Sequence, residues 1–282
     1  MKQKRREHME NEKLKFYATN VRKDILTEVH AAQSGHPGGS LGAADLLTAL
    51  YFDEMDITEE NLDSIDRDRF VLSKGHASPL LYAVLCEKGF MKKEELLTFR
   101  QINSRLQGHP NMNYVAGVDM STGSLGQGIS TAVGMAMANK LDGNAHRIYA
   151  LLGDGECQEG QVWEASMAAG HYKLDNLCVI VDHNGLQIDG NVADVMNVDP
   201  LEDKFKAFNF HVIKINGHDF DEIKAAFKEA RETKGMPTAI IAMTIKGKGV
   251  SFMENQAGWH GTAPNDEQYE QAMNELGGED HE

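Results

Sequence analysis

The sequence has little cysteine, a minority of basic residues and no long apolar run, and each shortage excludes a class of protein. Only three cysteines occur, Cys86, Cys157 and Cys178, and their spacing forms no pair, which indicates reduced thiols in a cytoplasm. Lysine and arginine total 28 against 43 acidic residues, a net charge of −15, so we expect no nucleic-acid and no anionic-membrane surface. No apolar stretch reaches the length of a membrane span.

The rest of the composition is that of an ordinary globular protein. Hydrophobic residues make up 41% of the 282 residues and charged residues 25%, which suits a large α/β domain. We find no internal repeat and no low-complexity linker, and we therefore expect a single domain over 1–282. The basic start, 1–10, leads into no apolar core, so we expect a flexible end and no signal peptide, and we expect 265–282 to be an acidic tail.

Apolar residues at helical spacing predict three helices. The first covers 11–33 and ends in the glycine-rich segment 34–42. The second covers 160–173, and the third covers 219–234, where Asp219 is of the type that caps a helix.

Three short and almost uniformly apolar runs predict strands. They are 148–152, 177–181 and 238–245, and strands that are covered on both faces have this composition. Because strands and helices alternate along the chain, we predict an α/β fold, a doubly wound and mostly parallel sheet with helices on both faces.

Polar residues follow two of these strands at points that should lie side by side. Asp154 comes just after the first strand, in the sequence GDG, and Asn184 just after the second, one strand–helix–strand unit later. Ligands of such sheets bind at the edge where the strands end. Oxygen ligands suit Mg²⁺, which commonly combines few protein ligands with substrate phosphates. We therefore predict a metal that holds phosphates here, with the N–H of Gly155 open to a phosphate oxygen.

On spacing alone a second interpretation stays open, because Asp and Asn after strands are common turn and capping residues. The larger pattern is more specific, since residues 153–190 resemble the signature of thiamine-diphosphate enzymes over its whole length. The resemblance implies the thiamine-diphosphate-binding fold of the type that holds the diphosphate. It also implies Mg²⁺, or another divalent ion such as Ca²⁺ or Mn²⁺, on Asp154, Asn184 and the carbonyl oxygen of Leu186.

Four glycine-rich loops carry one histidine each. They are His36 in SGHPGGSLG, His76 in LSKGHASPLLYA, His109 in GHPNMNY and His260 in GWHGTAP. A lone histidine on a loop is more often a surface residue, but loops of this kind let the backbone approach a ligand closely. In this order and with these neighbours the four resemble the histidine set of the transketolase family, and the resemblance runs from about 14 to 264.

The resemblance implies a role for each matching residue. His76 and His260 would reach the diphosphate, and His260 would also face the reacting sugar. His36 would take part in proton transfer at a substrate oxygen, and His109 would hold the C1 hydroxyl of the donor. Imidazoles suit this work because alkoxides form and disappear near pH 7. Three further residues complete the set: Gly123 and Leu125 against the aminopyrimidine ring and its linker, and Glu159 as an acid at the subunit interface.

Two neighbouring residues need a separate interpretation. In the sequence SKGH, Lys74 stands where many full-length transketolases have Asn, a difference that the short split forms share. Lys74 would add positive charge near the diphosphate, and a solvent-facing lysine is the alternative. His183 lies beside Asn184, but alternation along an extended segment should turn it away from that ligand.

The implied activity is the transfer of a two-carbon ketol unit from a ketose or its phosphate to an aldose or its phosphate. The pentose phosphate pathway is the expected pathway, and the donor and acceptor sugars stay open. Three alternative functions also stay open. The alpha subunit of a 2-oxo-acid dehydrogenase lacks the histidine loops, a 1-deoxyxylulose-phosphate synthase is normally a longer chain, and a non-catalytic subunit would not need the histidines.

The resemblance also implies a partner. In the transketolase family the cofactor lies across two domains, and a glutamate of the second domain bonds the pyrimidine ring. Residues 265–282 are too few to form that domain. We therefore expect the N-terminal subunit of a split transketolase, inactive alone and active with a C-terminal subunit of about 300 residues in an α2β2 assembly.

Overall fold

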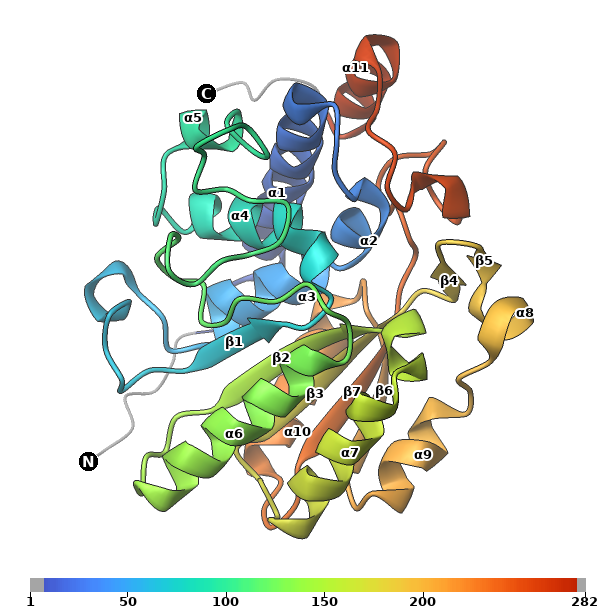
Figure 1. Cartoon of the computed structure of the whole chain (residues 1–282). Helices are drawn as coiled ribbons and strands as arrows, with labels where there is room; N and C mark the ends of the chain where they lie inside the picture. Colours follow the sequence, from blue (N-terminus) through green and yellow to red (C-terminus); the bar gives the residue numbers. More distant parts are fainter. Residues whose placement is uncertain (1–7, 278–282) are drawn as a thin grey trace.

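The computed structural model describes residues 8–277, which are built around a parallel sheet (Figure 1). Its five strands follow the order β1-β2-β3-β7-β6, and every neighbouring pair is parallel. The bounds are β1 Arg69–Leu72, β2 Ile148–Gly153, β3 Leu177–His183, β6 His211–Asn216 and β7 Thr238–Met243. Two short strands, β4 Leu186–Gln187 and β5 Gly190–Asn191, form a separate antiparallel pair. The predicted α/β class with a parallel sheet is confirmed.

Helices cover both faces of the sheet. One face packs against α6 (Gln127–Leu141), α7 (Gly160–His171) and α9 (Leu201–Ala207), and the other against α1 (Asn11–Ala32), α3 (Ala44–Ala49), α4 (Ser78–Glu87) and α10 (Phe220–Glu232). In Figure 1, α6 and α7 lie in front of the sheet and α10 lies behind it. The remaining helices are α2 Pro37–Gly42, α5 Lys93–Leu96, α8 Val192–Met196 and α11 Asp266–Glu275.

The two faces of the sheet belong to two separate hydrophobic cores. In β2, Tyr149 and Leu151 pack into the core under α1, α4 and α10, whereas Ile148, Ala150 and Leu152 pack into the core under α6 and α7. Successive side chains of a strand point to opposite faces, so a strand covered on both sides must be apolar throughout. The uniformly apolar runs in the sequence therefore follow from burial on both faces.

The predicted helices and strands are present with boundaries shifted by one to a few residues. Asp219 caps α10 as expected, because its side chain accepts hydrogen bonds from the backbone N–H groups of Asp221 and Glu222. Two strands of the five-stranded sheet escaped prediction, as did the short pair β4 and β5. β1 is only four residues long, and β6 lies at the edge of the sheet, where of its six residues only Ile215 is buried.

The expectation of an acidic tail over 265–282 is wrong for its first part. Asn265 and Gln268 form a reciprocal cap that starts α11, and this helix packs against α1. The ring of Tyr269 stacks on His30 of α1 with centroids 4.2 Å apart, and Ala272 is buried. Apolar residues at helical spacing within an acidic segment were the missed signal.

The expected flexible start falls mostly on residues 1–7, which lie outside the described residues, as do 278–282. Of the remaining part, His8 and the backbone N–H of Met9 both bond the Asp53 carboxylate, at 2.9 and 2.5 Å. None of the helices within 8–277 combines the length and the apolar character that crossing a membrane requires.

Candidate functional site

A cavity of about 340 Å³ lies at the carboxyl ends of β2 and β3, where the glycine-rich loops converge. This is the edge of the sheet at which α/β proteins bind their ligands. The cavity collects nearly all the residues that the sequence singled out: His36, His76, Gly123, Leu125, Asp154, Gly155, Glu159, Asn184, Leu186 and His260. Residues far apart in the chain therefore form one site.

Asp154 and Asn184 are neighbours, as the parallel pairing of β2 and β3 requires. Gly153 pairs with Asp182 in the sheet, and the backbone N–H of Gly185 donates to Oδ2 of Asp154 at 2.6 Å. The other oxygen, Oδ1, accepts from the N–H of Gly155 at 2.7 Å. Each carboxylate oxygen keeps a further lone pair for a cation.

The donor set fits a hard cation with few protein ligands. Oδ1 of Asn184 accepts from the N–H of Leu186 at 3.1 Å, and its amide nitrogen donates to Asp182 at 3.0 Å, so the amide orientation is fixed. The described residues contain no group of three or more His, Cys, Asp and Glu side chains suited to a metal. A metal here would use one carboxylate, one amide oxygen and a backbone carbonyl, with its other positions left to water or phosphate.

Three imidazoles face one another across the cavity. The ring centroids of His36 and His76 lie 5.3 Å apart, those of His36 and His260 5.5 Å, and those of His76 and His260 5.1 Å. His36 immediately precedes α2, His76 lies in the turn before α4, and His260 follows β7. The fold thus brings three of the four predicted histidines within reach of a single small molecule.

Burial and nearby cations keep these imidazoles neutral. Burial lowers the pKa of His36 to about 4, with smaller contributions from Arg100, His109 and Lys246. Burial followed by Lys246 lowers the pKa of His260 to about 3. Burial also holds the pKa of His76 well below its usual range, and Lys74 adds to the effect. At neutral pH each ring therefore has one N–H donor and one acceptor nitrogen.

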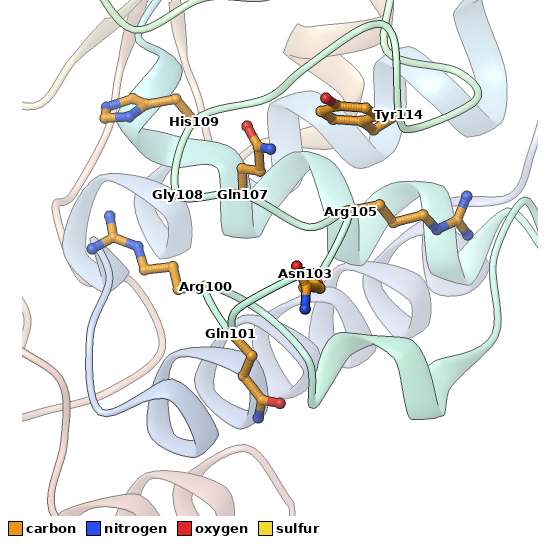
Figure 2. Close-up of a pocket in the computed structure, with 9 residues that line it drawn as sticks. Arg100, Gln101, Asn103, Arg105, Gln107, Gly108, His109 and Tyr114 are labelled. Carbon is orange, nitrogen blue, oxygen red and sulfur yellow. The ribbon is translucent and has the colours of Figure 1, made fainter.

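His109 lies apart from the other three. It lines a second, more open hollow of about 760 Å³, together with Arg100, Gly108 and Tyr114 (Figure 2). The two cavities share a border, because a Cβ atom added to Gly123 of the first cavity would lie 3.2 Å from the His109 ring. Burial lowers the pKa of His109, and Arg100 lowers it further.

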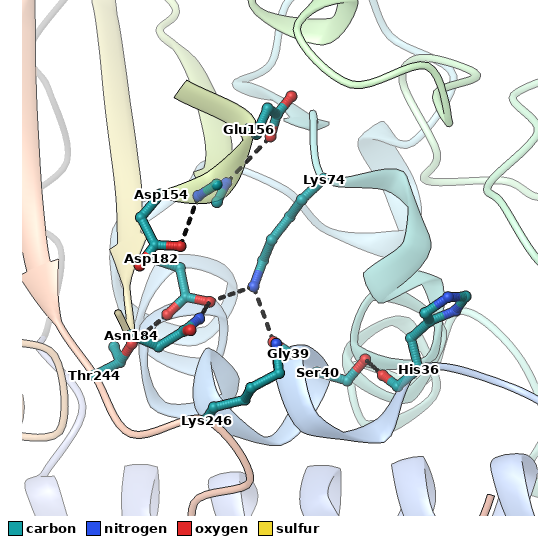
Figure 3. Close-up of polar contacts among 12 residues, drawn as sticks. His36, Gly39, Ser40, Lys74, Asp154, Glu156, Asp182, Asn184, Thr244 and Lys246 are labelled. Carbon is teal, nitrogen blue, oxygen red and sulfur yellow. Dashed lines mark hydrogen bonds and ion pairs between the residues drawn. The ribbon is translucent and has the colours of Figure 1, made fainter. Parts of the chain in front are cut away.

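Lys74 is buried, so the solvent-facing alternative is wrong. Its ammonium group donates to Oδ2 of Asp182 at 2.5 Å and to the carbonyl of Gly39 at 2.9 Å (Figure 3). Asp182 also accepts from the hydroxyl of Thr244, and its side chain is fully buried. Lys74 and Asp182 thus tie α2, the end of β3 and the end of β7 together beneath the cavity.

Lys246 lines the cavity and was missed in the sequence. Its Nζ lies 3.0 Å from Nδ1 of His260. Burial and repulsion from Lys74 lower the pKa of Lys246 to about 8. Lys246 follows a predicted strand in TIKGKG, so the same rule that selected Asp154 and Asn184 could have found it.

Glu156 is a second missed residue, and it holds three loops of the site together. One oxygen accepts from the hydroxyl of Ser73 at 2.5 Å and from the N–H of Gly126 at 2.9 Å, and the other accepts from the N–H of Gly153 at 3.1 Å. No sequence pattern marks this role, because the three partners come from different parts of the chain.

Close approach of these loops requires glycine at two points. A Cβ atom on Gly75 would lie 2.7 Å from the backbone nitrogen of Gly123, where the loop of His76 meets the predicted aminopyrimidine loop. A Cβ atom on Gly38 would lie 2.7 Å from the carbonyl oxygen of Trp259, next to His260. Real Cβ atoms do not come so close to backbone atoms, so side chains at these positions would push the histidine loops apart.

Known proteins match this chain along nearly its whole length. Residues 15–282 match the family model described as transketolase, thiamine diphosphate binding domain. The 6-deoxy-6-sulfo-D-fructose transketolase subunit SqwG of Clostridium sp. (strain MSTE9) is 45% identical over 93% of this chain and 96% of its own length. One of the subunits of the apulose-4-phosphate transketolase of Phocaeicola vulgatus is 43% identical over 95% of both chains.

Full-length transketolases match with a part of their chain. Human transketolase is 42% identical over 93% of this chain but only 42% of its own length. The crystal structure of transketolase from Campylobacter jejuni superposes with a TM-score of 0.90 at 38% identity, covering 96% of this chain and 44% of that one. This chain therefore belongs to the transketolase family and corresponds to its thiamine diphosphate binding domain.

Proposed function

We propose that this chain is the thiamine-diphosphate-binding subunit of a two-chain transketolase, which transfers a two-carbon ketol unit from a ketose to an aldose. The observation that carries the proposal is the cavity itself, which combines the oxygen donors of Asp154 and Asn184 with three neutral imidazoles. Two relatives of nearly the same length carry the word subunit in their names, which supports the division into two chains.

The residues of the cavity fit thiamine diphosphate and a divalent cation. Asp154, Asn184 and the carbonyl of Leu186 would hold Mg²⁺, or Ca²⁺ or Mn²⁺ in its place. His76 and Lys246 would bind the diphosphate, and Gly123 and Leu125 would lie against the aminopyrimidine end. Gly155 lines the same cavity, but its N–H donates to Oδ1 of Asp154 and is not open to a phosphate oxygen as the sequence suggested. The fit is supported by the positive charge of Lys74 and Lys246, which can attract the anionic diphosphate. Without these two lysines, the cavity at the ends of β2 and β3 would be acidic. When bound, the cofactor supplies an electron sink for the two-carbon fragment.

The histidines would handle the protons of the sugar. His36 and His260 are neutral at pH 7, so each can donate a hydrogen bond to a sugar oxygen without adding fixed charge. His109, on the border of the second hollow, would hold the C1 hydroxyl of the donor ketose. Hydrogen-bond donors that are held in fixed positions lower the activation barrier when negative charge develops on a sugar oxygen.

We further propose a C-terminal partner of about 300 residues and an α2β2 assembly. Glu159 supports an interface here, because it is exposed on the rim of the cavity at the start of α7. The three free and buried cysteines suit a reducing compartment such as the cytoplasm. The two named relatives act on different sugars, so the substrate and a pentose phosphate role stay proposals that activity assays must decide.

The test is a mixing experiment. The purified chain is incubated with Mg²⁺, thiamine diphosphate, a ketose donor and an aldose acceptor, first alone and then with the candidate second subunit. We expect two-carbon transfer only in the mixture. Turnover by the chain alone would contradict the two-chain proposal, and cofactor binding without turnover in any mixture would favour a non-catalytic role for this chain.

A further inference from the structure

Arg100 has several unusual features for a residue with no assigned role. Its backbone φ is 58°, in the left-handed region that residues other than glycine seldom adopt. Its Nε is buried and has no hydrogen-bond partner among the described residues. Strain and unsatisfied polar groups cluster at functional sites, where the surrounding structure maintains them.

The surroundings of Arg100 fix the direction of its guanidinium group. One Nη donates to the hydroxyl of Ser34 at 2.7 Å, and the group lies 5.4 Å from the ring centre of Phe99. Gly108 leaves room for it, because a Cβ atom there would lie 2.7 Å from Nε. The backbone N–H of Arg100 donates to the carbonyl of Leu106 at 2.9 Å, which closes the loop that presents the side chain.

The second Nη points at a histidine of the cavity. It lies 3.3 Å from Nδ1 of His36. Arginine carries only donors and is not deprotonated in proteins, so in this contact Nδ1 must be the acceptor. The proton of the neutral ring then resides on Nε2, and His36 has a donor, not an acceptor, at that position.

We propose that Arg100 is a positioning residue that holds His36 in the neutral form protonated at Nε2, so that this N–H is available to a substrate oxygen. The part that concerns substrate rests on the proposed function, whereas the protonation state of His36 is a property of this chain alone. The charged and titratable groups that face His36 are Arg100, His109, Lys246, His76 and His260. None of these five groups is acidic, so none of them would stabilise the doubly protonated ring.

The contact gives His36 a definite chemical role. A neutral imidazole can exchange its donor and acceptor nitrogens at little cost unless a neighbour distinguishes them. A wrong tautomer keeps the ring in place but presents a lone pair where the reaction needs a proton. Arg100 removes that ambiguity before any ligand binds.

The test is nuclear magnetic resonance of the full chain labelled with ¹⁵N-histidine. Long-range ¹H–¹⁵N correlations distinguish the two neutral tautomers, and the signals of His36 are identified by their loss in His36→Gln. We expect the wild-type ring to be protonated at Nε2. In Arg100→Met we expect a mixture of tautomers and a rise in the pKa of His36, because both the hydrogen bond and the positive charge are removed.

Two variants separate the possible causes. Arg100→Lys keeps the charge without the forked donor, so we expect a pKa closer to that of the wild type but a mixed tautomer. Arg105→Met is the matched control, because Arg105 belongs to the same loop, pairs with Glu95 at 2.6 Å and points away from His109 in Figure 2. We expect it to leave the His36 signals unchanged. The signals of the other histidines report whether each variant is folded.

An unchanged tautomer and pKa of His36 in folded Arg100→Met would overturn the proposal. In the assembled enzyme, Arg100→Met should lower kcat by about 10-fold or more, part of the roughly 10²–10⁴-fold that a positioned acid–base group contributes. The affinity for thiamine diphosphate should stay the same. If the enzyme proves to have another activity, the kinetic part fails while the tautomer result stands, so the two failures are distinguishable.

Discussion

The ammonium nitrogen of Lys74 lies 2.5 Å from Oδ2 of Asp182, and both side chains are almost completely buried. Removing one partner of a buried ion pair leaves the other charge without compensation, which costs about 3–5 kcal/mol. We therefore expect Lys74→Met to lower the free energy of unfolding by that amount in urea titrations. The double variant Lys74→Met/Asp182→Asn should recover part of the loss, because no buried charge remains unpaired. A loss below about 1 kcal/mol in the single variant would show that the pair is not essential to stability.

The metal site predicts a loss of Mg²⁺-dependent cofactor binding when the charge of Asp154 is removed. Asp154→Asn keeps one of the two oxygens, and so an acceptor for the N–H of either Gly155 or Gly185, but removes the charge that a cation needs. We expect calorimetric titration of the assembled enzyme to show little Mg²⁺-dependent binding of thiamine diphosphate. Asp189→Asn, another carboxylate of the same cavity, should bind normally. Equal affinity in Asp154→Asn and wild type would remove Asp154 from the metal site.

The separate position of His109 predicts that its loss affects the substrate and not the cofactor. We expect His109→Ala to raise the KM for the donor ketose and lower kcat, with a total cost in kcat/KM of roughly 1–3 kcal/mol. Cofactor affinity should be nearly unchanged, since His109 does not line the cavity of Asp154 and Asn184. His171→Ala, a histidine in α7 outside both cavities, is the control. Steady-state kinetics that match the wild type for every donor would exclude His109 from the site.

A buried carboxyl in α1 predicts an unusual dependence of stability on pH. Asp24 lies beside Glu87 and Lys93, and burial raises the pKa of Asp24 to about 7. The folded chain therefore holds this proton more tightly than the unfolded chain. The resulting stabilisation is complete below a pH of about 4 and disappears as the pH rises through about 7, a contribution of roughly 2–4 kcal/mol.

Asp24→Asn isolates this contribution from those of other acids. We expect the difference in the free energy of unfolding between the variant and wild type to change between pH 5 and pH 8, with the variant relatively more stable at pH 8. Urea titrations at the two values measure it. Parallel pH profiles would show that Asp24 has an ordinary pKa in the folded chain.

The sequence predicted the parts of the fold and site that depend on local patterns. The helix of 160–173 shows helical spacing of its apolar residues, its two flanking strands are short apolar runs, and parallel pairing then places Asp154 next to Asn184. The glycine-rich loops of His36, His76 and His260 are also recognisable from a few neighbouring residues. Their convergence in one cavity follows from the fold that these local elements build.

Contacts between distant loops could not be predicted in this way. The residues next to Lys74 in the sequence do not indicate whether this lysine is buried or exposed. Its ion pair with Asp182, 108 residues away in the sequence, shows that it is buried. Glu156 bonds groups from three separate segments, and Arg100 reaches His36 from a loop with no recognisable pattern. Hydrogen bonds and ion pairs between distant segments depend on the tertiary structure. The pattern of apolar and polar residues within one helix or strand, in contrast, shows directly which side of that element is buried.

Because the five strands run in the same direction, the cavity lies at one edge of the sheet and the opposite edge is free for attachment. The strands begin at the edge of the sheet opposite the cavity, where the exposed turn of Asp142 and Gly143 precedes β2 and the segment 233–237 precedes β7. A fluorophore or an immobilising tag attached at this turn would be held at the far end from the histidines and the loops around them. The enzyme could then be fixed to a surface or tracked in solution while its chemical end stays open to substrate and to any partner that closes over it.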